Sequence, residues 1–273
     1  MLSVVVPSYR QRATICAELQ RLHALLSALT PDHEIVLVID GDTDGTAEEL
    51  LRVPWFPELR VERFPENCGK GAALRHGLRA ARGELVAFLD AGEDLDATEF
   101  RRFLAAMTLY DADIVIGSKR HTLSEVAYPP IRRLYSWTYQ LLNRVLFRMK
   151  IRDTQVGMKL FRREVLAAVL PRLVVKAFAF DLELLVVAHR LGFTRIVEAP
   201  VRIRYGFRSS ISWRAVFRTL WDTLAVFYRL RILHWYDVPQ QLEAPPSAHP
   251  VPLRVAVPTT EESLVRSVRE PAR

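Results

Sequence analysis

Short apolar runs alternate with amphipathic segments over the first 118 residues. Five runs have the length and the aliphatic or aromatic content of buried strands. The segments between them carry apolar residues three and four positions apart, as amphipathic helices do. The predicted strands are residues 2–6, 34–39, 59–64, 85–89 and 114–117, and the predicted helices are residues 13–29, 46–51, 70–81 and 97–109. This alternation predicts an α/β fold with an open, mainly parallel, twisted sheet and helices on both faces.

The pattern changes after Ser118 to two long aromatic helices, separated by a mixed segment with a predicted strand at residues 196–203. The apolar stripe of the first helix consists of Ile131, Leu134, Thr138, Leu141, Leu142, Val145 and Met149. The stripe of the second consists of Trp213, Val216, Phe217, Leu220, Leu224, Phe227 and Tyr228. Arginines occupy the remaining faces, which is typical of helices that lie in a membrane interface. The same stripes could instead pack on the sheet or on a second subunit, which leaves a homo-oligomer open.

These changes divide the chain into a domain at residues 1–212, an amphipathic interface helix at 213–238 and a tail at 239–273. The tail holds seven prolines in 35 residues and has no clear periodicity, so we expect disorder there. The apolar first run begins at once, without a basic leader, and no stretch free of charged residues exceeds ten residues. We therefore expect neither a signal peptide nor a spanning helix.

The formal net charge of +7 is unevenly distributed. Residues 1–118 carry 12 basic and 19 acidic side chains, whereas residues 119–237 carry 22 basic and 8 acidic ones. The second part is therefore suited to binding anions. No helix-turn-helix, zinc-knuckle or RNP signature accompanies the basic residues, so we expect no nucleic-acid partner and favour phosphates of a small molecule or lipid. The two cysteines are too few for a disulfide framework or a four-ligand zinc site.

The candidate chemistry lies at the carboxyl ends of the predicted strands, where open α/β sheets bind ligands. The segment Asp40–Gly45 resembles the opening of a calcium loop, but position twelve is Leu51 instead of Glu, and a strand precedes it. Asp42 and Asp44 are turn formers in the simpler interpretation. The first strand lacks a dinucleotide-binding glycine fingerprint, and residues 69–71 lack the P-loop spacing.

Three carboxylates, those of Asp90, Glu93 and Asp94, follow the fourth strand closely. Like charges at this density are costly unless a cation compensates them. A hard divalent ion, Mg²⁺ or Mn²⁺, held by carboxylate oxygens and substrate phosphates would do so. A solvated acidic loop is the alternative.

Five motifs in order, VVVPSYRQ, DGDTDGT, ENCGKGAAL, AFLDAG and DIVIGSK, resemble those of the family 2 glycosyltransferases with the GT-A fold. The likeness extends from residue 2 to about residue 211. The strings GSKRH, DTQVGMKLF and FDLE resemble those of polyprenyl-phosphate or dolichyl-phosphate hexosyltransferases, with DTQVGMKLF closer to the dolichyl-phosphate glucosyltransferase branch. The resemblance implies a nucleotide-binding half at residues 1–118 and an acceptor half at residues 119–212.

The resemblance also implies roles for individual residues. The nucleotide sugar would be bound by Pro7, Tyr9, Gln11, Asp40, Lys70, Asp90, Ala91, Arg120, Arg202 and Arg208. The chemistry would involve Asp90, Asp94, Asp153 and Asp181. Asp153, or Asp181 with Glu183, could position the acceptor or a helper lysine such as Lys159, and Asp181 and Glu183 could equally hold basic side chains within the fold. The family usually has a second metal-binding Asp where this chain has Gly92, so we expect Asp94, with Glu93, to hold the ion. Gln11 also stands where the family commonly has Glu.

The resulting expectation is an inverting, metal-assisted hexosyltransferase. It would use UDP-glucose or GDP-mannose as donor and a polyprenyl phosphate as acceptor, at the cytoplasmic face of a membrane. A family 2 enzyme with a soluble or polysaccharide acceptor is one alternative. A nucleotide-sugar-binding protein without turnover, suggested by Gly92, is another.

Overall fold

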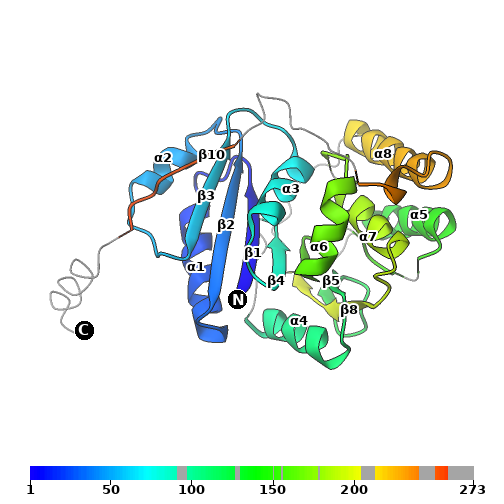
Figure 1. The fold of residues 1–273 in the computed structure, drawn as a ribbon, viewed down its shortest axis with the longest axis horizontal. Coiled ribbons are helices and arrows are strands. Elements are labelled where there is room, and N and C mark those ends of the chain that lie inside the picture. Colours follow the sequence, from blue (N-terminus) through cyan, green and yellow to red (C-terminus); the bar gives the residue numbers. More distant parts are fainter. Residues whose placement is uncertain are drawn as a thin grey trace.

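One main sheet crosses the molecule, with helices packed on both of its faces (Figure 1). The structure, a computed structural model, describes residues 1–90, 97–126, 130–149, 151–154, 156–177, 179–203, 213–239 and 250–257. Its strands are β1 (Leu2–Ser8), β2 (His33–Asp40), β3 (Leu59–Phe64), β4 (Leu85–Leu89), β5 (Ile114–Ser118), β6 (Glu125–Val126), β7 (Met158–Arg162), β8 (Ile196–Pro200), β9 (Arg202–Ile203) and β10 (Val251–Pro252). Its helices are α1 (Ile15–Leu29), α2 (Thr46–Leu51), α3 (Lys70–Ala80), α4 (Ala97–Leu109), α5 (Pro130–Phe147), α6 (Arg163–Val169), α7 (Phe180–Arg190) and α8 (Trp213–Arg231), with short 3₁₀ turns η1 (Leu170–Arg172) and η2 (Trp235–Asp237).

The strand order of the main sheet is β10-β3-β2-β1-β4-β7-β5-β8. Strands β3, β2, β1 and β4 are mutually parallel, and β5 is parallel to β8. Strand β7 runs antiparallel between β4 and β5 and joins these two parallel groups. The expected open, mainly parallel sheet is thus confirmed, and the carboxyl ends of its parallel strands form one edge, which we call the rim.

Successive side chains of each strand enter different cores because strand side chains alternate between the two faces. Val5, Val36 and Val38 pack in one core, mainly with residues of α3, α6 and α7. Val4 and Leu37 pack in the other, mainly with residues of α1 and α4. Strands that are buried on both faces explain the unbroken apolar runs in the sequence.

The middle of the chain contains elements that the sequence pattern did not predict. Strand β7 carries Lys159 and Arg162, so its run does not read as an apolar strand. Helix α7 is buried on all sides from Phe180 to Ala188, which removes the amphipathic periodicity. The strand predicted at residues 196–203 is divided into β8 and β9, and β9 pairs with β6 in a separate small sheet.

Residues 250–257 correct the expectation of a disordered tail for this stretch. Strand β10 pairs antiparallel with β3, and the amide of Leu253 donates to the carbonyl of Val61 at 2.9 Å. The amide of Trp55 donates to the carbonyl of Ala256 at 2.7 Å. This part of the tail therefore covers the outer edge of the sheet.

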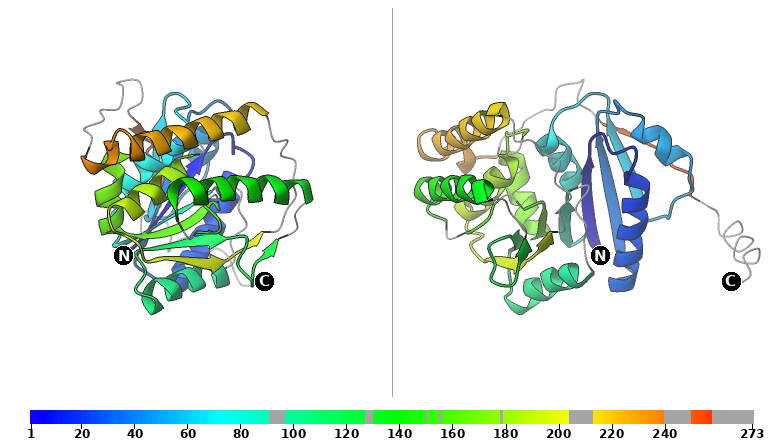
Figure 2. Two further views of the ribbon diagram at one scale, coloured as in Figure 1. Left: turned by 90° about the vertical axis from the view of Figure 1, so that its right-hand side faces the viewer. Right: turned by 180° about the vertical axis from the view of Figure 1, so that it is seen from behind.

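Helices α5 and α8 lie across one side of the molecule, which faces the viewer in the left view of Figure 2. Tyr139 and Thr223 join them by a hydrogen bond of 3.0 Å, and Phe147 packs edge-to-face on Phe227. No helix in the part of the chain that the structure describes has the length and apolar character needed to cross a membrane.

Candidate active site

Buried polar atoms without hydrogen-bond partners gather at the rim. Within the described ranges they include Ser8 Oγ at the end of β1, Asp90 Oδ1 after β4 and Ser118 Oγ at the end of β5. Thr154 Oγ1 is a fourth, and it precedes β7, which begins at the same edge because it runs antiparallel. Such atoms normally bind water or a ligand, since burying them unpaired costs free energy. The rim is therefore the candidate site, as expected from the fold.

Four charged side chains form a chain of ion pairs behind the rim. Lys70, the first residue of α3, places its Nζ 2.8 Å from Asp90 Oδ2 and 3.4 Å from Asp181 Oδ2. Lys159 of β7 places its Nζ 2.6 Å from Asp181 Oδ1 and 2.7 Å from the carbonyl oxygen of Val156. The side chains of Lys159 and Asp181 are 0% and 3% exposed, whereas those of Lys70 and Asp90 are 22% and 29% exposed. The chain thus leads from the interior to the accessible rim.

Charge pairing outweighs burial at both central members of this chain. Burial alone lowers the pKa of Lys70, but the charges of Asp181 and Asp90 raise it above the ordinary value. Burial likewise raises the pKa of Asp181, but Lys159 and Lys70 bring it below the ordinary value. Lys70 therefore remains a cation at the rim despite its position at a helix N-terminus, where positive charge is disfavoured.

Two glycines permit this arrangement. A Cβ atom at Gly157 would lie 2.4 Å from Asp90 Oδ2, and the carbonyl of Gly157 accepts a hydrogen bond from the Asp90 amide at 2.9 Å. A Cβ atom at Gly71 would lie 2.8 Å from Cβ of Phe180, and the Gly71 amide donates to the carbonyl of Lys176. Close packing thus requires both glycines, Gly157 of the DTQVGMKLF string and Gly71 of the ENCGKGAAL string.

Asp40 anchors the loop that leads to Lys70. Its Oδ1 accepts the amide of Cys68 at 2.6 Å, and its Oδ2 accepts the amide of Gly69 at 2.9 Å. Burial raises the pKa of this carboxyl, and the two backbone hydrogen bonds oppose the rise. The structure therefore gives Asp40 a positioning role, through the backbone before α3.

The acidic turn after β2 caps helix α2. Asp44 Oδ1 accepts hydrogen bonds from the amide and hydroxyl of Thr46, and Asp42 Oδ1 accepts from the amide of Ala47. These contacts agree with the interpretation of both residues as turn formers. They occupy the carboxylates that a calcium loop would use.

The residues after β1 differ in exposure. Pro7 is half-buried, whereas Tyr9 is 40% exposed, with the guanidinium of Arg10 over its ring at 5.1 Å. The side-chain oxygen of Gln11 accepts the hydroxyl proton of Thr14 at 2.7 Å, in the turn before α1. Tyr9 is thus the member of this group whose ring is available to stack on a planar ligand.

The part of the chain after β5 contributes residues from the other end of the rim. Asp153 is buried, and its Oδ2 accepts the amide of Lys119 at 3.2 Å, beside Arg120. The backbone amide of Arg202 donates to the Glu99 carboxylate, which joins β9 to α4. Asp153 therefore fixes the turn after β5, which carries Lys119 and Arg120.

Glu183 acts within the fold. Its Oε2 accepts the amides of Val174 and Val175 at 3.0 and 2.8 Å, and its Oε1 accepts the hydroxyl proton of Tyr236 at 2.7 Å. The guanidinium of Arg229 lies 3.7 Å from Glu183 Oε1. Glu183 thus joins α7 to the end of α8 and to the loop that contacts Gly71.

The family model for glycosyl transferase family 2 matches residues 3–170 of the chain. The chain belongs to this family. Its assignment confirms the resemblance that the five rim motifs indicated.

Curated relatives of the chain are named dolichyl-phosphate beta-glucosyltransferases. ALG5A of Trichomonas vaginalis is 34% identical over 242 residues, covering 84% of the chain and 74% of the relative. ALG5C of the same organism is 32% identical over 209 residues, covering 72% and 62%. The Drosophila melanogaster relative is 33% identical over 219 residues, covering 75% and 66%. The chain thus spans 62% to 74% of the length of these three relatives.

Solved structures confirm the GT-A fold. Mannosyl-3-phosphoglycerate synthase from Rubrobacter xylanophilus superposes with a TM-score of 0.64 at 18% identity, covering 90% of this chain and 78% of that one. Glucosyl-3-phosphoglycerate synthase from Mycobacterium tuberculosis, in complex with UDP, gives 0.59 at 19% identity, covering 88% and 82%.

The structure brings together some of the site residues that the sequence predicted. Asp90, Lys70 and Asp181 are in contact, whereas Asp40 reaches Lys70 only through the backbone. Four predicted site residues, Ala91, Glu93, Asp94 and Arg208, lie outside the described residues, as does Gln155 of the DTQVGMKLF string.

Sequence reasoning gave Lys159 and Glu183 only general roles and missed Tyr236 and Arg229. A lysine within the otherwise apolar string Met158–Phe161 was a usable signal, because a buried lysine requires a carboxylate partner. The contact between Glu183 and Tyr236 joins residues 53 positions apart and has no comparable signal.

Proposed function

We propose that the transferase moves a hexose from a nucleoside diphosphate sugar to a polyprenyl phosphate at a membrane surface. The observation that carries the proposal is the Lys70 ammonium, held between Asp90 and Asp181 at the rim. The relatives, by name dolichyl-phosphate beta-glucosyltransferases, favour a lipid phosphate as acceptor and UDP-glucose over GDP-mannose as donor.

The proposed reaction is an inverting displacement at the anomeric carbon. An oxygen of the acceptor phosphate forms the new bond, and the bond to the donor diphosphate breaks, with the electron pair leaving on the nucleoside diphosphate. A phosphate monoester has its second pKa near 6, so it is largely a dianion at neutral pH and needs no strong general base. Lys70 would stabilise negative charge on the departing diphosphate, because its charge is held in place before the reaction.

One observation supports a divalent metal at this site. Asp90 Oδ1 is buried and has no partner among the described residues, while Oδ2 is paired with Lys70. The described ranges contain no group of three or more His, Cys, Asp or Glu residues that could hold a metal. Because Asp90 Oδ1 lacks a partner among the described residues, we propose that Asp90, together with Asp94 and Glu93, would hold Mg²⁺ or Mn²⁺. The ion would supply further charge stabilisation for the leaving diphosphate.

The exposed side of α5 and α8 supports attachment to a membrane. Trp137 and Val145 of α5 are 55% and 67% exposed, and Phe217 and Trp221 of α8 are 66% and 74% exposed. Together with Leu141, Leu224 and Tyr228, they form what we call the aromatic face. Exposed apolar patches of this kind mark interaction sites, and arginines beside them attract anionic lipids. We propose attachment at the cytoplasmic leaflet.

A transfer assay tests the reaction. UDP-glucose and GDP-mannose are each incubated with an undecaprenyl or dolichyl phosphate in detergent, with Mg²⁺, Mn²⁺ or EDTA, and the lipid product is measured. We expect glucosyl transfer with inversion, and Lys70→Met should lower kcat by about 100-fold or more, as loss of a charge-stabilising donor does. Lys176→Met, an exposed lysine, is the matched control. Transfer to soluble acceptors alone would refute the lipid phosphate as acceptor. Full activity of Lys70→Met would refute the role of Lys70 in stabilising the leaving diphosphate.

Vesicle co-sedimentation tests the attachment. The double variant Trp137→Ser, Trp221→Ser should bind vesicles at least tenfold less tightly, because each indole removes on the order of 100 Å² of apolar surface from water. The control, Leu109→Ser with Leu123→Ser, removes equally exposed apolar side chains elsewhere. Equal losses in both variants would contradict the assignment of the aromatic face.

A further inference from the structure

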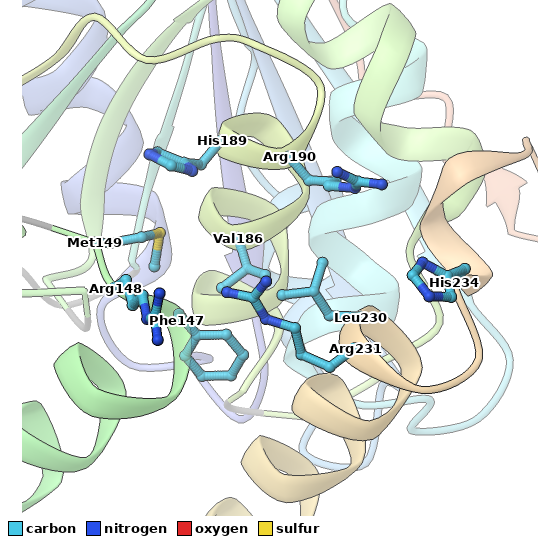
Figure 3. Close-up of a pocket in the computed structure, with 9 residues that line it drawn as sticks. All are labelled: Phe147, Arg148, Met149, Val186, His189, Arg190, Leu230, Arg231 and His234. Carbon is cyan, nitrogen blue, oxygen red and sulfur yellow. The ribbon is translucent and has the colours of Figure 1, made fainter.

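A cavity of about 340 Å³ lies where the C-terminal ends of α5, α7 and α8 meet (Figure 3). Its floor is apolar, with Phe147, Met149 and Val186 buried and Leu230 of α8 partly buried beside them. Its mouth is basic, with five Arg and His side chains contributed by the three helix ends and the segments that follow them. An apolar floor below a basic mouth suits a ligand that has an anionic head and an apolar body.

Among the described residues, one carboxylate neutralises only part of the basic mouth of this cavity. Asp237 accepts two hydrogen bonds from Arg190, at 2.9 and 3.0 Å, and lies 3.5 Å from His234. No carboxylate among the described residues pairs with Arg148 or Arg231, and both side chains are exposed. In Figure 3 the guanidinium of Arg231 reaches from α8 toward the end of α5, where Arg148 lies. Two unpaired guanidinium groups present the planar donors that bind phosphate oxygens.

The cavity is separate from the rim of the sheet. Asp181 lies in the first turn of α7, whereas His189, which lines the cavity, lies in its last turn. At 1.5 Å per residue the eight-residue separation corresponds to about 12 Å along the helix. The cavity is therefore distinct from the site proposed for the sugar donor.

The cavity opens beside the aromatic face. Arg231 is the last residue of α8, next to Ile232 and Leu233, which are 60% and 50% exposed, and one turn after Tyr228. If these side chains enter a membrane, the guanidinium groups of the cavity lie at the level of the phospholipid headgroups. A headgroup phosphate is thus the anion that this position favours over a free one.

We propose that the cavity binds the phosphate of an anionic phospholipid between Arg148 and Arg231, with the glycerol and first acyl carbons on the apolar floor. This inference rests on the membrane attachment proposed above. The bound lipid would set the orientation of α5 and α8 on the surface, and neutral phospholipids would not replace it, since their headgroups carry a compensating positive charge.

The test compares binding of the full chain to phosphatidylcholine vesicles with and without 20% phosphatidylglycerol. The variant Arg148→Gln, Arg231→Gln should lose about 10- to 30-fold in affinity for the anionic vesicles, as expected for two arginines near an anionic surface. A first control, Arg144→Gln with Arg218→Gln, removes exposed arginines of α5 and α8 outside the cavity. A second control, Arg52→Gln with Arg101→Gln, removes the same charge from α4 and the end of α2. We expect a clearly smaller loss for the first control than for the cavity variant, because its arginines would meet the surface only diffusely, and less than a threefold change for the second control.

Equal losses in the cavity variant and the first control would overturn the proposal, because they would indicate a diffuse charge effect. Displacement of the vesicles by 10 mM inorganic phosphate at constant ionic strength would also overturn it, by identifying a free-phosphate site. Transfer to a lipid phosphate in detergent should be unchanged in the cavity variant. A wild-type chain that binds anionic vesicles but transfers no sugar would refute the proposed function and leave the lipid site intact.

Discussion

The buried pair of Lys159 and Asp181 gives the sharpest prediction about stability. Replacing Lys159 with Met removes the cation 2.6 Å from Asp181 and leaves that carboxylate inside the core. Removing one partner of a buried pair costs about 3–5 kcal/mol. Lys70 remains 3.4 Å from Asp181, so we expect the lower end, about 3 kcal/mol.

A double variant distinguishes the contribution of the ion pair to stability from the contribution of the packing around it. Lys159→Met with Asp181→Leu replaces both charges by apolar side chains, and buried pairs exchanged in this way are often near neutral. We therefore expect the double variant to be more stable than Lys159→Met alone by about 3 kcal/mol, the difference between the two cases. The coupling energy follows from the double-mutant cycle.

Urea unfolding, followed by tryptophan fluorescence and far-UV circular dichroism, measures these differences. Lys176→Met is the matched control and should change the free energy of unfolding by less than about 0.5 kcal/mol, as exposed substitutions do. Two results would refute the reasoning. One is a cost below about 1 kcal/mol for Lys159→Met, and the other is a double variant whose cost equals the sum of the two single ones.

Two further changes probe the rim, and a third probes Glu183 within the fold. Gly157→Ala should displace the Asp90 carboxylate, which lies 2.4 Å from the new Cβ, and lower kcat/KM by at least tenfold, whereas an unchanged value would contradict the close approach. Asp40→Asn leaves one of two backbone amides without an acceptor, so we expect a loss of about 1–3 kcal/mol in unfolding experiments and a raised KM for the nucleotide sugar. Burial raises the pKa of Glu183 above 4.5, so the contribution of its titration to stability is greatest below that pH and declines as the pH rises through the folded pKa. Glu183→Gln should therefore become less destabilising relative to wild type as the pH rises above 4.5, and a pH-independent difference would argue against it. Asp181, whose pKa is lowered from 3.8, has the opposite sign, with stability present above that pH and lost on acidification.

The sequence predicted the first half of the fold closely because its strands are buried on both faces. Residues 59–64, 85–89 and 97–109 match β3, β4 and α4 without any shift of their bounds. The start of α1 is displaced from residue 13 to Ile15, since a turn precedes the helix and the carbonyl of Gln11 accepts the amide of Ile15.

The second half was less predictable because charge is buried there. Lys159 interrupts the apolar pattern of β7, and Asp181 and Glu183 interrupt that of α7, although all three side chains are buried. Each depends on a partner distant in the sequence, and local periodicity does not carry such information.

The same reason limited the prediction of the site. Asp90 and Lys70 were identified because they follow strands, but the ion pairs that hold Lys70 depend on the unexpected elements β7 and α7. On the aromatic face, Phe217 and Leu224 were predicted and are exposed, whereas Phe227 packs against the core. Trp221, whose side chain is 74% exposed, was not singled out.

The return of the chain to β3 at residues 251–252 bears on how the protein can be shortened. The family match ends at residue 170, which suggests that a chain ending at residue 239 would lack nothing essential. Yet that truncation would uncover backbone amides and carbonyls along the outermost parallel strand, and such an edge recruits strands from other molecules. A chain that ends at residue 239 is therefore expected to be limited by aggregation during purification.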